Sequence, residues 1–307
     1  MKLVSSEDKK IIFIIIQSEK ETFLMNNYCA AAVTIVTVSY NSSNLLVSML
    51  ASVPNETPVV IVDNGSEDSE ALMDLEKRPN THIIYNKINV GFGAACNIGA
   101  KISKTEFILF LNPDCRLEID TIEKLLLAAS KYPELVAANP LFEDRKGKVS
   151  FKRKSSLVSS KLWVQKSLPV KDRSVPILLG AAFFVRTKKF HKIGGFDENI
   201  FLFFEDDDLS LRLSGSPEAL MLIHNATVKH AGGASSNFSL ESEKIKNWNW
   251  GYSWIYTRKK HSRPLASVLP ICQTFLKLSS PFVLFSRRRR LKYSFRLLGI
   301  LNAIKTL

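Results

Sequence analysis

Four consecutive acidic residues, Glu205 to Asp208, directly follow an apolar run at positions 200–204. Adjacent carboxylates repel one another, and contact with large apolar side chains further disfavours their charged forms. Acid–base chemistry uses such surroundings, because one carboxyl group can hold a raised pKa while its neighbours bind cations. A helix start is the structural alternative, since acids suit the positive end of the helix dipole and Asp208 stands four residues before Arg212. Both interpretations can hold, each for different acids.

The composition favours an anionic partner. The chain has 307 residues, 46% of them hydrophobic, and a formal net charge of +13. Such a charge suits phosphorylated ligands, nucleic acid or an acidic membrane face. Nucleic acid is not expected here, because no recognisable binding module occurs and the cluster at 205–208 is acidic. The four cysteines form no C-x-x-C pair, which argues against zinc and disulfides and favours a reducing, cytoplasmic compartment.

From residue 32 onward, apolar β-branched runs alternate with amphipathic segments. Repeated β–α units of this length predict an α/β domain with a mostly parallel sheet and helices on both faces. We expect this domain over residues 31–236. The predicted strands are 33–38, 59–62, 82–85, 107–111, 135–138, 177–185, 220–223 and 226–228, and the predicted helices are 42–50, 66–75, 93–102, 119–132, a short one after 205, and 240–260.

The two ends of the chain depart from this pattern. Residues 1–30 are expected to be a leader, either disordered or upstream of a true start at Met25. Residues 237–307 are predicted to form a helical extension. Its apolar stretch at 265–285 contains Lys277 and two prolines, and four arginines follow at 287–290. An in-plane or re-entrant helix with a polybasic anchor therefore fits better than a transmembrane helix. A helical hairpin packed on the domain is the alternative.

Polar residues follow each of the first four predicted strands. In open α/β sheets, ligands bind at the carboxyl ends of the strands, so these residues predict a polar crevice. A nucleotide suits it, because Asp63 or Asp114 could accept from a base or ribose, and glycine N–H groups could approach phosphate. A dinucleotide fingerprint does not fit, since Cys96 stands where its third glycine belongs, and no Walker A sequence occurs.

Six short motifs occur in a fixed order along the chain: TVSYN at 37–41, VDNGS at 62–66, NVGF at 89–92, LNPD at 111–114, GGFD at 194–197 and FEDDDL at 204–209. Together they resemble the inverting glycosyltransferases of family 2, of the rhamnosyltransferase-like kind that builds bacterial surface polysaccharide. The resemblance covers about residues 32–235. It implies a GT-A fold, with a nucleotide-sugar on the N-terminal half and an acceptor on the C-terminal half.

The resemblance also implies roles for individual residues. Asp63 would contact the base, and Asp114 would be the last acid of the D-x-D motif that holds Mg²⁺ or Mn²⁺. Asp206 would be the general base beside Glu205, and His230 would lie near the metal, although a lone histidine is often structural. The nucleotide-sugar site would comprise Ser39, Tyr40, Asn41, Asp63, Asn64, Gly65, Asn89, Gly91, Phe92, Asn97 and Asn112, and the acceptor site would include Gly180 and Phe204.

Two departures from the family pattern refine this expectation. Asn112 replaces a carboxylate of the D-x-D motif, so metal binding is expected to depend on the substrate phosphates. The Gln-x-x-Arg-Trp sequence of processive synthases is missing, which favours transfer of a single sugar.

The implied reaction moves rhamnose from dTDP-rhamnose to a lipid-linked saccharide at the cytoplasmic face of the inner membrane. Another hexosyl donor, or a non-catalytic nucleotide- or carbohydrate-binding module, are the alternatives. Among the acids, Asp208 is expected to pair with Arg212, and Asp207 to face solvent.

Overall fold

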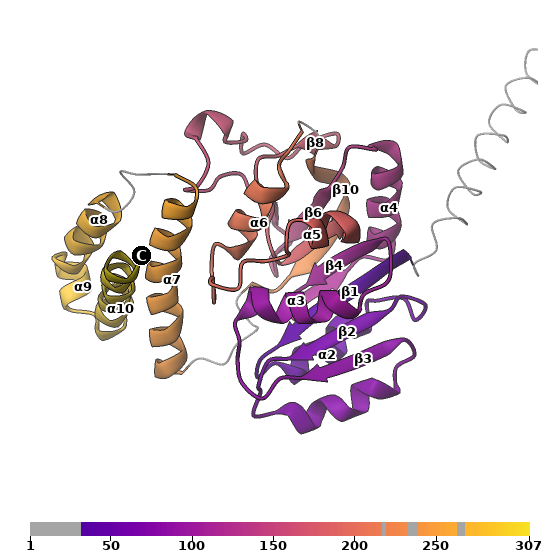
Figure 1. Cartoon of the computed structure of the whole chain (residues 1–307), viewed down its shortest axis with the longest axis horizontal. Coiled ribbons are helices and arrows are strands. Elements are labelled where there is room, and N and C mark those ends of the chain that lie inside the picture. Colours follow the sequence, from indigo (N-terminus) through magenta and orange to yellow (C-terminus); the bar gives the residue numbers. More distant parts are fainter. Residues whose placement is uncertain (1–31, 217–218, 233–238, 263–267) are drawn as a thin grey trace, which may run out of the picture.

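The computed structural model describes residues 32–216, 219–232, 239–262 and 268–307 (Figure 1). The leader expected over 1–30 lies outside these residues. A single twisted sheet has the strand order β3-β2-β1-β4-β9-β6-β10-β5, with β7 paired to β6 and β8 paired to β10. The strands are β1 (Val33–Ser39), β2 (Val59–Asp63), β3 (Thr81–Tyr85), β4 (Phe107–Leu111), β5 (Cys115–Leu117), β6 (Ala137–Glu143), β7 (Val149–Ser150), β8 (Arg173–Ser174), β9 (Ala182–Arg186) and β10 (Leu220–His230).

Most of the sheet is parallel, as the sequence predicted. Strands β3, β2, β1 and β4 pair in parallel, and β10 pairs in parallel with β6. Only β9 and β5 oppose this direction along the main path of the described sheet. The carboxyl ends of β1, β2 and β4 therefore meet at one edge.

Helices cover both faces of the sheet because the buried strands alternate their side chains (Figure 1). Ile35 of β1 joins a core with Leu46 and Leu125, whereas Val36 joins the opposite core with Ala95. The helices of the α/β part are α2 (Ser43–Leu50), η2 (Ser69–Lys77), α3 (Phe92–Ile102), α4 (Thr121–Lys131), η3 (Ser160–Leu162), α5 (Thr187–Lys192) and α6 (Glu205–Leu213).

Several element boundaries differ from the prediction. The run at 177–185 was predicted as one strand, but only β9, which begins at Ala182, pairs in the sheet. The preceding residues cross the sheet edge and hydrogen bond to α6 and to Asn139. Helix η2 is a 3₁₀ helix rather than an α-helix. The three shortest strands, β5, β7 and β8, were not predicted, because two or three residues are too few to show an alternation of apolar and polar side chains.

The C-terminal helices lie beside the α/β part (Figure 1). Helix α7 crosses α10 at two glycines. A side chain at Gly251 would collide with the backbone of Arg296, and one at Gly299 with the backbone of Trp248. The two helix backbones therefore touch, and Trp254, Ile255 and Ile300 form a small separate core beside them. The helices are α7 (Leu240–Lys260), α8 (Val268–Leu278), α9 (Pro281–Leu284) and α10 (Arg287–Thr306).

Candidate active site

Asp63 lies at the edge where the parallel strands end. It stands opposite Ser39 of β1 and Tyr85 of β3 in the strand register. Only 2% of Asp63 is exposed, and burial raises the pKa of its carboxyl group although Ser66 N–H donates to Oδ1 at 3.3 Å. A carboxyl group buried at the ligand-binding edge of the sheet is stabilised when an N–H of a base or a hydroxyl of a ribose donates a hydrogen bond to it. The contact of Asp63 with the nucleotide base stays a prediction.

The other residues of the first two motifs shape the rim of this edge. Ser39 is fully buried and its hydroxyl lies 3.2 Å from that of Ser42. Asn41 accepts from the Glu67 N–H at 2.8 Å, and Gly65 has a φ of +78°. Tyr40 is 40% exposed. Of these residues, Tyr40 therefore presents the most open surface for stacking on a ligand.

Asn64 uses its side chain inside the protein. Its Nδ2 donates to Asn89 Oδ1 at 2.9 Å and to the Gly91 carbonyl at 3.3 Å. Its Oδ1 accepts from Asn86 Nδ2 and from the Val90 N–H, both at 3.1 Å. All four hydrogen-bonding positions are filled. Asn64 and Asn89 therefore fix the loop between β3 and α3 and contact no ligand through these atoms.

Gly91, Phe92 and Asn97 join this loop to the turn that precedes the acids. Gly91 N–H donates to Asn89, and Phe92 N–H donates to the Phe201 carbonyl at 3.0 Å. Asn97 donates to the Phe196 carbonyl and accepts from its N–H, at 2.9 and 2.8 Å. A glycine N–H contact with phosphate was expected at Gly91, but this N–H is already bonded. The three residues position the two halves of the site against each other.

Asn112 and Asp114 form a second polar centre, at the end of β4. Asp114 is 6% exposed. Both of its carboxylate oxygens, and the Oδ1 of Asn112, are buried and accept no hydrogen bond from any described residue. His230 Nε2 lies 3.5 Å from Asp114 Oδ1. Buried oxygens without donors are costly unless a cation satisfies them. The arrangement fits a divalent metal ion that Asn112, Asp114 and His230 would hold.

Cys115 lies in the same cluster, since its sulfur and the ligand atoms of Asp114 and His230 lie within 4.8 Å of one another. Its thiol, however, donates to the Ala181 carbonyl at 3.4 Å. Burial raises the pKa of this thiol well above its ordinary value, which favours its neutral form. Hard Mg²⁺ and Mn²⁺ prefer oxygen and nitrogen donors. Cys115 is therefore part of the core rather than a ligand.

Asp206 is held at the start of α6 by three donors. Lys152 Nζ donates to Oδ2 at 2.8 Å and the Gly180 N–H donates to the same oxygen at 2.9 Å. The Asp207 N–H donates to Oδ1 at 2.8 Å. Oδ1 thus retains lone-pair capacity for a further donor. The geometry leaves one oxygen of Asp206 able to accept a proton.

Glu205 and Asp207 flank Asp206 in surroundings that favour their protonated forms. Burial, followed by the charge of Asp206, raises the pKa of Glu205 to about 8. The same two causes raise the pKa of Asp207 to about 6, although Lys152 Nζ lies 2.8 Å from its Oδ1. Glu205 Oε2 is buried without a hydrogen-bond partner among the described residues. The expectation that Asp207 faces solvent is wrong, because it is 5% exposed.

Asp208 has a structural role, as the helix-start interpretation predicted. Arg212 donates to its Oδ2 from Nε at 2.8 Å, which is the expected i,i+4 pair. Its Oδ1 lies 2.8 Å from His261 Nε2 and 2.7 Å from Lys260 Nζ. Lys260 also pairs with Asp197 at 2.6 Å. Asp208 is fully buried, and these contacts fasten α6 and the preceding turn to the end of α7.

Residues 180 and 181 connect the two centres. Gly180 N–H donates to Asp206, whereas the next carbonyl, that of Ala181, accepts from the Asn112 N–H at 2.9 Å. A Cβ atom at Gly180 would lie 3.2 Å from that of Asp206. One short crossing segment therefore touches both the acid and the metal-binding loop. Gly180 supports Asp206 directly, in addition to its predicted place at the acceptor.

The turn before α6 is strained. Phe203 and Phe204 have φ values of 69° and 68°, a left-handed conformation that costs a bulky residue about 1–3 kcal/mol. Ser253 of α7 holds this turn by donating to the Leu202 carbonyl at 2.9 Å. The ring of Phe204 lies 5.7 Å from that of Trp250. Strain maintained by such contacts is common at functional sites.

Sequence reasoning missed the partners that come from distant segments. Lys152 belongs to none of the six motifs, and its place between Asp206 and Asp207 follows from a long connection that carries no periodic signal. Lys260, the last residue of α7, and His261, directly after it, likewise reach Asp208. The sequence did offer one signal. A buried cluster of four acids at 205–208 requires positively charged partners, which must come from basic residues elsewhere in the chain.

The raised pKa of Glu205 predicts a pH-dependent stability. Folded Glu205 keeps its proton up to about pH 8, whereas the unfolded chain loses it near pH 4.5, so stability falls as pH rises between these values. We expect Glu205→Gln to gain stability relative to the wild type from pH 5 to pH 8, by at most about 1.4 kcal/mol per pH unit. Urea unfolding at pH 5, 6.5 and 8 measures this. An equal difference at all three values contradicts the assignment.

Comparison with known proteins identifies the family. The family described as "Glycosyl transferase family 2" matches residues 34–194. The N-acetylglucosaminyl-diphospho-decaprenol L-rhamnosyltransferase of Mycobacterium tuberculosis is 29% identical over 229 residues, which are 64% of this chain and 75% of that protein. The dTDP-rhamnosyl transferase RfbF of Shigella flexneri is 24% identical over 283 residues, which are 88% and 92% of the two chains.

Solved structures agree on the fold. The mannosyltransferase PcManGT from Pyrobaculum calidifontis, determined with GDP-Man and Mn²⁺, has a TM-score of 0.56 at 14% identity and covers 89% of this chain and 86% of its own. TarS of S. aureus in complex with UDP-GlcNAc has a TM-score of 0.52 at 15% identity, covering 89% and 91%. These similarities show the GT-A fold. With the fold, the two polar centres and the matched family in agreement, the chain belongs to glycosyltransferase family 2 and is an inverting enzyme that uses a nucleotide-sugar.

Proposed function

We propose that the protein transfers a single rhamnose from dTDP-rhamnose to a lipid-linked saccharide. One observation carries the proposal. Two centres of complementary chemistry flank one short segment: the Gly180 N–H donates to the carboxylate of Asp206, and the Ala181 carbonyl accepts from the backbone N–H of Asn112. On the Asn112 side, its Oδ1 and both carboxylate oxygens of Asp114 accept no hydrogen bond from any described residue. Inversion needs the diphosphate leaving group and the attacking hydroxyl on opposite sides of the same sugar carbon. The rhamnosyltransferases among the relatives support the choice of sugar.

On the acceptor side, Asp206 is the general base. The ammonium group of Lys152 and the N–H of Gly180 stabilise its charged form through Oδ2. Oδ1 then takes the proton of an acceptor hydroxyl that approaches to about 3 Å. Phe204 walls the site, and protonated Glu205 can donate a hydrogen bond to the donor sugar or orient Asp206.

On the donor side, Asp63 accepts from the nucleotide base and Tyr40 offers an open ring at the rim. Asn112, Asp114 and His230 would hold Mg²⁺ or Mn²⁺, which when bound offsets the negative charge that grows on the leaving diphosphate. Because the oxygen of Asn112 is neutral, Asp114 is the single carboxylate among these three ligands. We therefore expect tight metal binding only when donor phosphates are present.

A screen of nucleotide-sugars tests the proposal. We expect dTDP-rhamnose to be turned over in the presence of Mn²⁺ or Mg²⁺ with a kcat/KM at least about 10-fold above those of UDP-glucose and UDP-galactose, a ratio that one well-placed sugar contact supplies. Release of nucleoside diphosphate measures each rate. A preference for another donor would leave the family assignment intact and overturn the choice of rhamnose.

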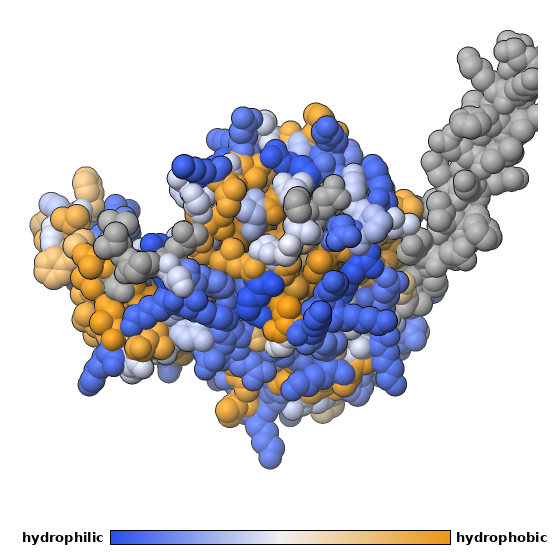
Figure 2. Space-filling view, turned by 45° about the horizontal axis from the view of Figure 1, so that its top comes forward, coloured by the Kyte–Doolittle hydropathy of each residue, from blue (hydrophilic) through white to orange (hydrophobic). Residues whose placement is uncertain are grey.

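We further propose that the C-terminal helices bind the cytoplasmic face of a membrane in its plane. No helix within the described residues is long and apolar enough to cross a membrane. Apolar side chains gather on the far end of this helical unit (Figure 2), where Phe282 and Phe285 are 78% and 91% exposed. The arginines at 287–290 follow directly. Exposed aromatic rings beside a polybasic segment suit an anionic lipid surface.

Vesicle co-sedimentation tests this surface. We expect binding to vesicles of phosphatidylglycerol and phosphatidylcholine, weakened at least about 10-fold in Phe282→Ser/Phe285→Ser, because each buried phenyl ring contributes roughly 1.5–3 kcal/mol. Ile119→Ser is the matched control, since Ile119 is 98% exposed on the α/β part. Equal binding by wild type and double variant would contradict the proposal.

A further inference from the structure

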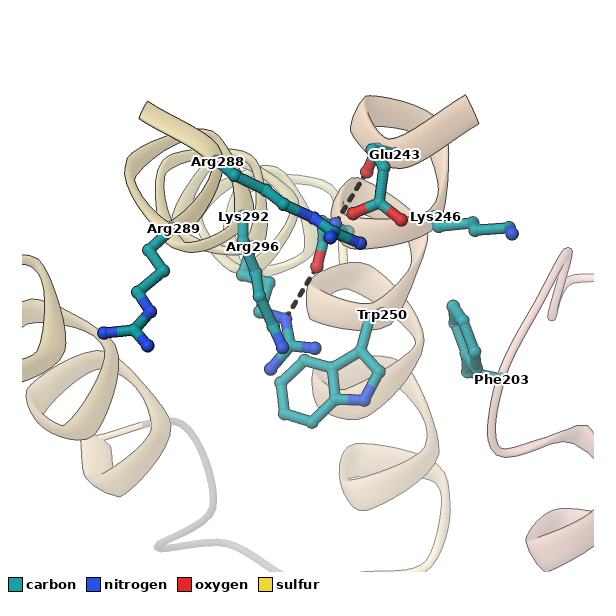
Figure 3. Close-up of a pocket in the computed structure, with 9 residues that line it drawn as sticks. Phe203, Glu243, Lys246, Trp250, Arg288, Arg289, Lys292 and Arg296 are labelled. Carbon is teal, nitrogen blue, oxygen red and sulfur yellow. Dashed lines mark hydrogen bonds between the residues drawn. The ribbon is translucent and has the colours of Figure 1, made fainter. Parts of the chain in front are cut away.

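A strongly basic pocket opens between α7 and α10. Its volume is about 430 Å³, and five cationic side chains line it with a single acid: Lys246, Arg288, Arg289, Lys292 and Arg296, with Glu243. Figure 3 shows Lys246 and Glu243 on α7, and Arg288, Lys292 and Arg296 on α10. Neither of the two polar centres described above includes any of these residues. The pocket is therefore a separate site, and it is positively charged, whereas the cluster at 205–208 is acidic.

Two of these cations, Arg288 and Arg289, conflict with the dipole of the helix that carries them. Helix α10 begins at Arg287, and its first turn contains four arginines and no acid. The amino end of a helix carries partial positive charge, so cations there are destabilising and anions are favoured. The helix dipole therefore does not favour this sequence, although Arg289 and Arg290 also donate to the carbonyls of Phe282 and Leu284 in α9. A bound anion would relieve both the mutual repulsion of the cations and their conflict with the helix dipole.

Part of the pocket is rigidly built. The guanidinium of Arg296 stacks on Trp250, with its carbon 4.0 Å from the ring centroid, and Nε donates to Asn247 Oδ1 at 3.0 Å. The backbone of Arg296 itself lies against Gly251 of α7, which fixes the two helices against each other beside the pocket. A guanidinium held in place loses less freedom when it binds a phosphate oxygen. This is the construction of a binding site rather than of a solvated surface.

The pocket adjoins the candidate active site. Phe203 lines it and stands two residues before Glu205. Trp250, on the pocket wall, contacts the ring of Phe204 at 5.7 Å. On the other side, α9 carries the exposed Phe282, whose carbonyl accepts a hydrogen bond from the pocket residue Arg289. A ligand in the pocket would thus have the acid cluster at one end and an apolar surface at the other.

We infer that this pocket binds the diphosphate of the lipid-linked acceptor. The inference rests on the proposed function and extends it by naming the group that the C-terminal helices recognise. Five cations suit a diphosphate better than a single phosphate, because it offers more oxygens and more charge. The sugar would then reach Asp206, and the prenyl chain would run toward Phe282 and the membrane.

Binding is tested without turnover. Tryptophan fluorescence follows titration of the full chain with geranyl diphosphate in EDTA, with saturating dTDP present to occupy the donor site. We expect saturable binding that weakens at least about 10-fold in Arg288→Gln/Lys292→Gln. Arg290→Gln/Lys305→Gln removes the same charge from the same helix outside the pocket and should bind within about 2-fold of the wild type. Thermal unfolding verifies that both variants fold.

The source of the phosphate is distinguished by two further ligands. Geranyl monophosphate should bind at least about 10-fold more weakly than geranyl diphosphate, and glycerol 1-phosphate, which represents a lipid headgroup, weaker still. Equal binding of glycerol 1-phosphate would overturn the inference in favour of a headgroup site. Equal loss in the two double variants would also overturn it, since general charge would then explain the affinity.

Steady-state kinetics separates this inference from the proposed function. Arg288→Gln/Lys292→Gln should have a KM for a diphosphate-linked acceptor at least about 10-fold above that of the wild type. Its KM for the donor should be unchanged. Its KM for an acceptor with a neutral alkyl aglycone should also be unchanged. Suppose that no nucleotide-sugar supports transfer, but Arg288→Gln/Lys292→Gln binds geranyl diphosphate more weakly than the wild type. The pocket inference then stands while the proposed function fails. If transfer occurs and the variant uses both acceptors as the wild type does, the pocket inference is wrong.

Discussion

Asp206→Asn is expected to lower kcat by about 10²–10⁴-fold, the usual contribution of a general base. The substitution preserves the shape of the side chain and removes its ability to take a proton. Donor binding should persist within about 2-fold, because the role proposed for Asp206 is on the acceptor side. The prediction is checked by the rate of sugar transfer together with donor titration.

Two controls make this test specific. Asp74→Asn changes a carboxylate in an exposed pair with Lys77 and should leave kcat unchanged. The thermal midpoint of Asp206→Asn shows whether the protein stays folded despite the altered contact with Lys152. Full activity in a folded Asp206→Asn protein would show that Asp206 is not the general base. Asp207, whose pKa is raised to about 6, would then be the next candidate.

Asp114→Asn should reduce metal-supported transfer by about 10²–10³-fold, because a metal ion contributes several kcal/mol of charge stabilisation at a leaving phosphate. The variant leaves two amides and His230 at the site, without any carboxylate. Chelation of the wild type by EDTA should cause a comparable loss that Mn²⁺ or Mg²⁺ restores, and Asp114→Asn should need a much higher metal concentration. Initial rates over a metal titration measure both effects.

Glu118→Gln is the matched control for that experiment. Glu118 pairs with Lys229 at 2.6 Å on the surface, one residue from His230 along β10. Its removal should shift neither the rate nor the metal dependence. A wild-type enzyme that is fully active in EDTA, together with an unimpaired Asp114→Asn variant, would show that Asp114 acts without a metal.

The sheet could be predicted because its strands are buried on both faces. Residues 33–38, 59–62 and 107–111 form continuous β-branched and aromatic runs, and these match β1, β2 and β4 closely. The order of strands could not be predicted, since the insertion of antiparallel β9 between β4 and β6 depends on contacts far apart in sequence. The start of the run at 177–185 was predicted wrongly for the same reason: Gly180 lies outside the sheet, and its N–H bonds to Asp206.

The candidate site could be predicted as a set of motifs but not as a network. The pair of Asp208 with Arg212 follows from helix geometry and is confirmed. The burial of Asp207 depends on Lys152, which is 55 residues away and lies in a segment without periodicity. Asn64 and Asn97 looked like ligand residues because they follow strands or open helices, yet their side chains hold loops together. Residue type alone does not distinguish these uses.

The stereochemistry of the product tests the central claim most directly. Wild-type protein is incubated with dTDP-rhamnose, Mn²⁺ and a saccharide linked through a diphosphate to a short prenyl chain, and the anomeric configuration of the new bond is read by NMR. Direct attack assisted by Asp206 predicts one added sugar whose configuration is opposite to that of the donor. A product with the donor's configuration retained would contradict this mechanism.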